Sequence, residues 1–146
     1  MYRVIPVSWN SAEADAARAI RMDVFVGEQN VPAEMELDEI DPTAFHVIGY
    51  SDSGLACGTG RLFAEVGEAG AGHIGRMAVA PHARGTGCGS AILLSLLEEA
   101  RRRGYHRAIL TAQTHAVAFY EKHGFAAYDD EFLDAGIPHR WMERRL

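Results

Sequence analysis

The stretch from Arg76 to Ser90 constrains the fold more than any other part of the sequence. Its first residues are apolar and predict a strand, and Pro81, which cannot donate to a sheet ladder, predicts where that strand ends. Three glycines follow within five positions, and from Ile92 the apolar residues recur at helical spacing. A glycine-rich turn that leads into a helix directs unpaired N–H groups and the positive end of the helix dipole at one place. The sequence therefore predicts an anion site here, and phosphate is the expected anion.

Two well-known phosphate loops do not match this turn. A P-loop requires a lysine after the glycines, and none is present. A dinucleotide loop requires the spacing G-x-G-x-x-G, whereas the glycines run G-x-G-x-G from Gly85 to Gly89. The pattern that does match, Arg84-x-x-Gly87-x-Gly89 after an apolar strand, resembles the pyrophosphate motif of the GNAT superfamily of acyl-CoA-dependent N-acyltransferases. Arg84 adds a permanent charge and a fork of donors suited to phosphate.

A second stretch carries the same resemblance. It reads Gln113-x-x-Ala116-x-x-Phe119-Tyr120-x-x-x-Gly124-Phe125 and is similar to the second half of the GNAT cofactor site, where an asparagine usually stands at the first position. Aromatic residues at helical spacing are by themselves more often part of a core. The two motifs follow in the right order and are about 30 residues apart, which leaves room for a helix and a strand. The resemblance covers about residues 73–128.

The order of expected elements indicates an α+β fold with a mixed sheet. Strands are expected over residues 2–7, 44–50, 55–66, 73–80, 106–112, 125–128 and 138–144, and helices over 14–29, 89–104 and 115–123. Because a helix joins the strands before Pro81 and before Gln113, these two strands should be parallel neighbours with a cleft between them. The expectation is a single GNAT acyltransferase domain over residues 1–146, with a central, mostly antiparallel sheet, a parallel, splayed strand pair and flanking helices.

The resemblance implies that acetyl-CoA (coenzyme A) is the cofactor. Backbone groups of Met77 and Val79 would bind the pantetheine arm, the N–H groups of residues 84–89 the pyrophosphate, and Tyr120 would protonate the departing thiolate. The full set of expected cofactor residues is Met77, Ala78, Val79, Arg84, Gly85, Thr86, Gly87, Cys88, Gly89, Ser90, Gln113, Ala116, Phe119 and Tyr120. Cys88 is expected to be a small packed residue and not a nucleophile.

The N-terminal half resembles the ElaA/YjcF branch of the same superfamily. The residues that carry this resemblance are Arg21-x-x-Val24-Phe25, Gly27-Glu28-Gln29, Val31-Pro32, Glu36-x-Asp38-x-x-Asp41, Ala44-x-His46 and the late run Ala135–His139. Acyl-homoserine lactone synthases share part of this pattern and draw their acyl chain from a carrier protein. This chain is shorter than those enzymes and has His73 where they usually have a glutamate.

The acidic run after residue 33 predicts an ion-pair network that shapes the acceptor pocket and favours a cationic amine. The expected acceptor-binding residues are Arg21, Phe25, Glu28, Asp38, Asp41, Arg61 and Arg76. An attacking amine must be neutral, so a base has to take its proton, and the candidate bases are Glu36, His46 and His139. Three functions stay open: an N-acetyltransferase that acts by direct attack in a ternary complex, an acyl-homoserine lactone synthase-like enzyme, and a non-catalytic CoA-binding sensor.

Composition excludes several other classes. The net charge of −6 argues against nucleic-acid binding. The two cysteines predict neither a disulfide framework nor a metal site. The sequence has no apolar run long enough to cross a bilayer, and it has no signal-peptide pattern. A cytoplasmic location without membrane partners is therefore expected. The expected partners are a small-molecule amine acceptor and, in a homodimer, a second copy of the chain.

Overall fold

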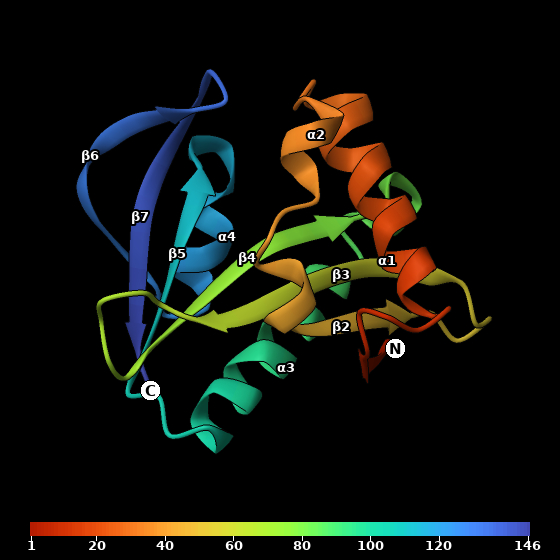
Figure 1. The fold of residues 1–146 in the computed structure, drawn as a ribbon, viewed down its shortest axis with the longest axis horizontal. Helices are drawn as coiled ribbons and strands as arrows, with labels where there is room; N and C mark the ends of the chain where they lie inside the picture. The colour runs from red at the N-terminus through yellow and green to blue at the C-terminus, as the bar shows by residue number, and fades with distance from the viewer.

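The computed structural model describes residues 1–146 as one sheet with helices on both of its faces (Figure 1). The strands are β1 (Arg3–Val7), β2 (Phe45–Tyr50), β3 (Ala56–Ala64), β4 (Ala71–Val79), β5 (Arg107–Gln113), β6 (Ala126–Asp134) and β7 (Ile137–Arg145). The α-helices are α1 (Ala14–Arg21), α2 (Ala33–Glu36), α3 (Cys88–Arg102) and α4 (Val117–Lys122). Shorter helical segments are the π-helical η1 (Met22–Glu28) and the 3-10 turns η2 (Asp41–Thr43), η3 (Pro81–Ala83) and η4 (Thr114–Ala116). None of the helices is both long and apolar enough to span a lipid bilayer.

The sheet contains one parallel strand pair, as the sequence predicts. Its order is β1-β2-β3-β4-β5-β7-β6, and every neighbouring pair is antiparallel except β4 and β5. Those two strands pair only at their beginnings, from Ala71 opposite Arg107 to His73 opposite Ile109. Beyond this point the two strands no longer pair with each other, so they diverge and leave a split in the sheet. The mixed, mostly antiparallel sheet with a splayed parallel pair is therefore confirmed.

Helix α3 covers one face of the sheet at very close range. A Cβ added at Gly58 would lie 2.5 Å from Ile92 Cδ1, and one added at Gly60 would lie 2.9 Å from Leu96 Cδ1. A larger residue at either position would displace these side-chain ends of α3. The apolar stripe of α3 and the α3-facing residues of the strands form the main core. Helix α1 and the segment from η1 to η2 lie on the opposite face, in front of β3 and β4 in Figure 1.

A β-bulge interrupts β4 beside the split. Thr59 pairs with Ala78 and Arg61 with Gly75, so two residues of β4 lie opposite the single residue between them on β3. One of the two is Arg76, whose φ of 49° lies in the left-handed region. The bulge adds one residue to β4. Side chains that follow it therefore point to the opposite face of the sheet from the one that regular alternation would give them.

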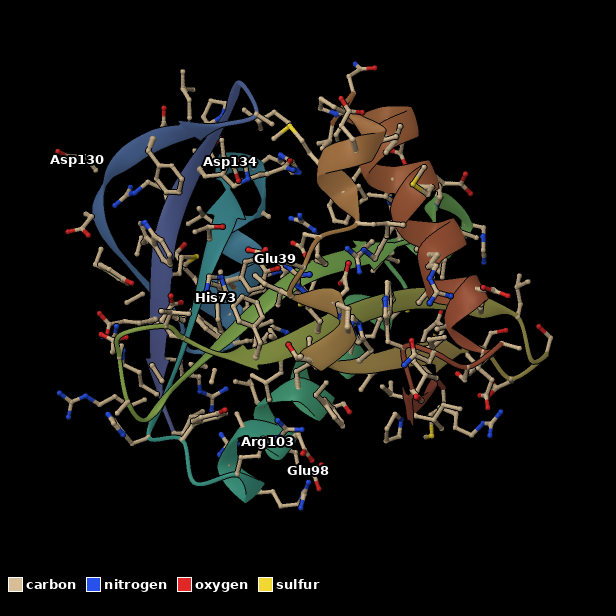
Figure 2. All side chains as sticks on the ribbon, in the orientation of Figure 1. Glu39, His73, Glu98, Arg103, Asp130 and Asp134 are labelled. Atoms are coloured by element: carbon tan, nitrogen blue, oxygen red, sulfur yellow. The ribbon has the colours of Figure 1, made fainter.

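Two expected elements differ in the structure. Residues 129–134 were expected as a connection, but they belong to the edge strand β6. Most of their side chains are exposed and acidic, so this part of the sequence lacks the alternation of apolar and polar residues by which a strand is predicted. Figure 2 shows Asp130 on the outer side of this strand. The expected helix over 14–29 is α-helical only to Arg21 and then widens into the π-helical η1, which brings Glu28 and Gln29 towards the split.

Candidate functional site

Two cavities meet at the split between β4 and β5. The front cavity, on the face covered by α1 and η1, has a volume of about 450 Å³. The rear cavity, at the start of α3, has a volume of about 470 Å³. Met77, His115, Ala116 and Tyr120 line both, so the two cavities adjoin at the split and share one wall. A ligand can therefore enter from each face and the two ligands can meet in the middle.

The rear cavity contains the glycine-rich turn. Gly85 and Gly87 have φ angles of 74° and 94°, and no atom lies within 4 Å of a Cβ added at either. Gly87 is the N-cap of the 15-residue helix α3, whose first N–H groups have no partner within the helix. The open space in front of these amides and the helix dipole together suit an anion of diphosphate type. This arrangement fits the phosphate end of coenzyme A.

Three of the expected cofactor residues, Ala78, Thr86 and Cys88, do not line this cavity. The hydroxyl of Thr86 hydrogen-bonds to the Ala83 carbonyl and the Tyr2 hydroxyl, and Ala78 is buried on the α1 side. Cys88 is 1% exposed, and burial raises the pKa of its thiol to about 11, so it is a packed residue as expected. Ser90 does line the cavity, with its hydroxyl 2.9 Å from Nε2 of a histidine that follows α4.

Segment η1 is joined to both cofactor motifs. Arg84 makes a bidentate ion pair with Glu28, with contacts of 2.9 and 2.6 Å, and its Nε donates to the Val79 carbonyl. Gln113 Nε2 donates to Gln29 Oε1 at 2.7 Å, from the far side of the split. Glu28 was expected to contact the acceptor, but it lines neither cavity and is paired with Arg84, a residue of the rear cavity.

Tyr120 lies where the two cavities join. Its hydroxyl donates to Met77 Sδ at 3.6 Å. Burial raises the pKa of Tyr120 to about 12, so the phenol keeps its proton at neutral pH and can donate it. At this position the hydroxyl could donate a proton to a group that is bound in the split.

Of the three candidate bases, only His139 lines a cavity. Its Nδ1 donates to the Ile137 carbonyl at 2.7 Å, which fixes the tautomer and leaves Nε2 as an acceptor. The ring stacks on Phe132 at 5.9 Å between centroids, and His139 lies opposite Gln113 in the β5–β7 register. An imidazole with a free Nε2 is therefore present on the wall of the front cavity.

The structure corrects the other two candidate bases. Glu36 and His46 are 1% and 2% exposed and line neither cavity. Glu36 accepts from Arg21 Nε at 2.6 Å, and burial raises its pKa despite that contact. His46 stacks on Trp9, hydrogen-bonds through Nε2 to a backbone carbonyl, and has a pKa lowered by burial. Both groups are packed inside the fold, where no acceptor reaches them.

The ion-pair network predicted from the acidic run is confirmed. Its members are Arg21, Arg61, Arg76, Glu36, Asp38 and Asp41. Arg21 bridges Glu36 and Asp41 from a fully buried position. Arg21 and Asp41 therefore belong to the buried part of the network and do not line the cavity. Asp38, Arg61 and Arg76 do line the front cavity, together with Phe25.

Sequence reasoning missed the floor of the front cavity. His73 Nδ1 hydrogen-bonds to Glu65 Oε2 at 2.6 Å, and its ring packs between Phe63 and Trp141. Burial lowers the pKa of His73, so the ring is neutral at neutral pH. Figure 2 shows His73 over the region where β4 and β5 meet. The sequence marks His73 only by its difference from the lactone synthases, and its contact with Phe63 follows from their pairing in the β3–β4 register.

These features are those expected of a group-transfer enzyme, with an anion site on one face of a split sheet and a second cavity on the other. The model of the acetyltransferase (GNAT) domain matches residues 12–146. The uncharacterized N-acetyltransferase YjcF of Bacillus subtilis is 40% identical over 93% of this chain and 95% of its own.

Solved structures agree with these matches. Escherichia coli ElaA superposes with a TM-score of 0.86 at 26% identity, and an acyl-CoA N-acyltransferase from Pseudomonas aeruginosa with 0.84 at 30% identity; each covers 99% of both chains. The chain belongs to the GNAT acetyltransferase family, the acyl-CoA N-acyltransferases. The resemblance to the ElaA/YjcF branch is likewise confirmed.

Proposed function

We propose that this enzyme transfers an acetyl group from acetyl-CoA to a primary amine of a small molecule by direct attack in a ternary complex. The observation that carries the proposal is that the two cavities adjoin at the split, with Tyr120 in the lining of both. Direct transfer requires donor and acceptor to be bound together with their reacting atoms in contact. The buried, largely protonated thiol of Cys88 supports a route without a covalent enzyme intermediate.

The residues of the rear cavity fit coenzyme A. The backbone N–H groups of residues 84–89 would hold the diphosphate, and backbone groups of Met77 and Val79 the pantetheine arm. Phe119, which lies 3.4 Å from a Cβ added at Gly89, would pack beside that arm. When bound, the cofactor supplies an activated acyl group on a thioester, whose leaving group is a thiolate.

Two side chains would move the protons of the reaction. His139 Nε2 would take a proton from the acceptor amine in the front cavity, because Nδ1 already donates to Ile137. Tyr120 would give a proton to the departing sulfur, because burial keeps its phenol protonated. Gln113 and Met77 lie beside these two groups, within the lining of the front cavity.

Replacing Tyr120→Phe should lower kcat by about 10²- to 10⁴-fold, because the acid is removed while the ring remains. Affinity for acetyl-CoA, measured by calorimetry, should change little. Tyr105→Phe is a matched control, because Tyr105 packs under Gly72 away from both cavities. Wild-type turnover in Tyr120→Phe would rule out the acid role.

Replacing His139→Gln should lower kcat/KM by about 10²-fold or more near neutral pH, since the amine then loses its proton only to solvent. The deficit should shrink as the pH rises and more of the amine is already neutral. Thiol release measured between pH 6 and pH 9 checks this. A deficit that stays constant across that range would mean that His139 positions the acceptor without accepting a proton.

The donor and the alternative functions can be tested together. Calorimetry with acetyl-CoA, longer acyl-CoAs and acyl-carrier protein identifies the donor, and we expect tight acetyl-CoA binding without carrier interaction. Binding to the carrier in place of acetyl-CoA would favour the lactone synthase-like alternative. Thiol release in an amine screen separates an enzyme from a CoA-binding sensor. A cytoplasmic location and a homodimer remain predictions.

A further inference from the structure

Arg76 is the loosely held member of the ion-pair network. Arg21 and Arg61 contact their carboxylates at 2.6–3.1 Å, with side chains 1% and 5% exposed. Arg76 makes longer contacts, 3.2 Å to the Met35 carbonyl and 3.3 Å to Asp38, and its side chain is 29% exposed. Its Nη1 donates to no protein atom. A guanidinium that lines the front cavity therefore keeps a free donor.

A second unused donor lies beside it. Arg61 Nε is buried and has no hydrogen-bond partner. A Cβ at Gly75 would come within 3.9 Å of this atom, and both residues line the front cavity. Buried donors without a partner are rare and destabilise a fold unless a ligand or water accepts from them. Arg61 therefore leaves one buried donor unsatisfied in the wall of the cavity, and Arg76 carries the donor that the cavity exposes.

The charge around these donors indicates which ligand they suit. The network balances three arginines with three carboxylates, so the network itself carries no excess negative charge. One further carboxylate, that of Asp134, lines the same cavity and is available to an ammonium group. Both Asp38 oxygens already accept from Arg61. A planar carboxylate matches a guanidinium fork. Because Arg76 shares its charge with neighbouring carboxylates, a monoanion suits it better than a doubly charged phosphate.

We propose that the acyl acceptor is an amino-carboxylate and that Arg76 binds its carboxylate in the front cavity. This inference rests on the proposed N-acyltransferase function. The opposite wall carries Phe132 and Trp141, whose rings stack at 6.1 Å, and a flat apolar side chain of the acceptor packs against them. The amine then points towards His139, which stacks on the same wall.

Pairs of amines that differ only in the carboxylate test the proposal. L-phenylalanine is compared with 2-phenylethylamine, and L-tryptophan with tryptamine, by thiol release from acetyl-CoA. The amino-carboxylate should show a kcat/KM about 10- to 100-fold higher, mainly through a lower KM, as expected for a charge-assisted pair. Equal use of both members of each pair overturns the proposal. So does preference for the phosphonate analogue of phenylalanine, which indicates a site for phosphate-like anions.

Variants of Arg76 assign the effect to this residue. Arg76→Gln should abolish the preference by raising KM for the amino-carboxylate, and Arg76→Lys should keep part of it, because the charge remains without the fork. Arg101→Gln, on the exposed surface of α3, is the matched control. Affinity for acetyl-CoA reports whether the rear cavity of each variant is intact. A preference unchanged in Arg76→Gln overturns the assignment.

A binding measurement separates this inference from the proposed function. If no amine releases thiol, the N-acyltransferase function fails, and calorimetric titration of the CoA-bound protein with each pair still decides the inference. Binding of L-phenylalanine that is stronger than that of 2-phenylethylamine and weakened in Arg76→Gln supports it. Equal binding of the two compounds contradicts it.

Discussion

Gly87→Asp should abolish coenzyme A binding while the protein stays folded. The new side chain has room, because no atom lies within 4 Å of a Cβ at Gly87, and aspartate tolerates left-handed angles better than most residues. Its carboxylate would stand at the N-terminus of α3, where the diphosphate is proposed to bind. Two like charges 4 Å apart in a partly buried site repel by about 4 kcal/mol, which corresponds to an affinity loss of about 1000-fold.

Two further substitutions separate charge from backbone strain. Gly87→Asn has the same shape without the charge, so it should weaken binding far less than the aspartate. Gly54→Asp places the same carboxylate on a glycine with φ of 84° in an open turn, and should leave affinity unchanged. Calorimetry with coenzyme A and thermal unfolding measure binding and folding separately. Equal affinity in Gly87→Asp and the wild type would mean that the glycine turn does not hold the diphosphate.

Arg21→Met should lower the free energy of unfolding by about 3–5 kcal/mol, because it leaves Glu36 and Asp41 buried without their shared partner. Arg101→Met, on the exposed surface of α3, should cost less than about 0.5 kcal/mol. Denaturant titration at pH 7 measures both values. Arg21→Met as stable as the control would show that the network contributes nothing net to folding.

The difference between Arg21→Met and the wild type should narrow in acid. Burial alone would raise the pKa of Asp41, but hydrogen bonds and charge from Arg21 hold that pKa below its usual range. The stability that the ionised carboxylate contributes is complete above its unfolded pKa of about 4 and is lost as the pH falls through the lowered value. The variant lacks this contribution, so titrations at pH 7 and pH 3 should show a smaller difference at pH 3.

The half of the site proposed for the cofactor could be predicted because its signals are local. A strand, a glycine turn and a helix start are consecutive in the chain, and the proposed anion site consists of their own backbone groups. The front half depends on side chains that meet across the sheet. His73 and Trp141 lie on strands that are far apart in sequence, and only the sheet order and the β4 bulge bring them to one cavity.

The sequence also did not show which of the candidate bases are buried in the core. Glu36 and His46 have the right chemistry for a base, and nothing in their spacing shows that both are packed inside the fold. His139 has the same chemistry but lines the cavity. Whether a titratable group faces a ligand or a core depends on long-range packing, which a pattern of neighbouring residues does not contain.

The sequence by itself determined the family, the α+β fold and the glycine turn, because each follows from residue types at short spacings. It also supplied the residues of the ion-pair network, but which arginine pairs with which carboxylate depends on contacts between distant parts of the chain. Only the tertiary structure decided which member of that network faces the cavity. The bulge at Arg76 and the pairing of Arg61 with Gly75 leave two guanidinium donors without full partners beside the split. Such unpaired donors arise from strand register and packing, because these alone determine which polar groups find partners inside the fold.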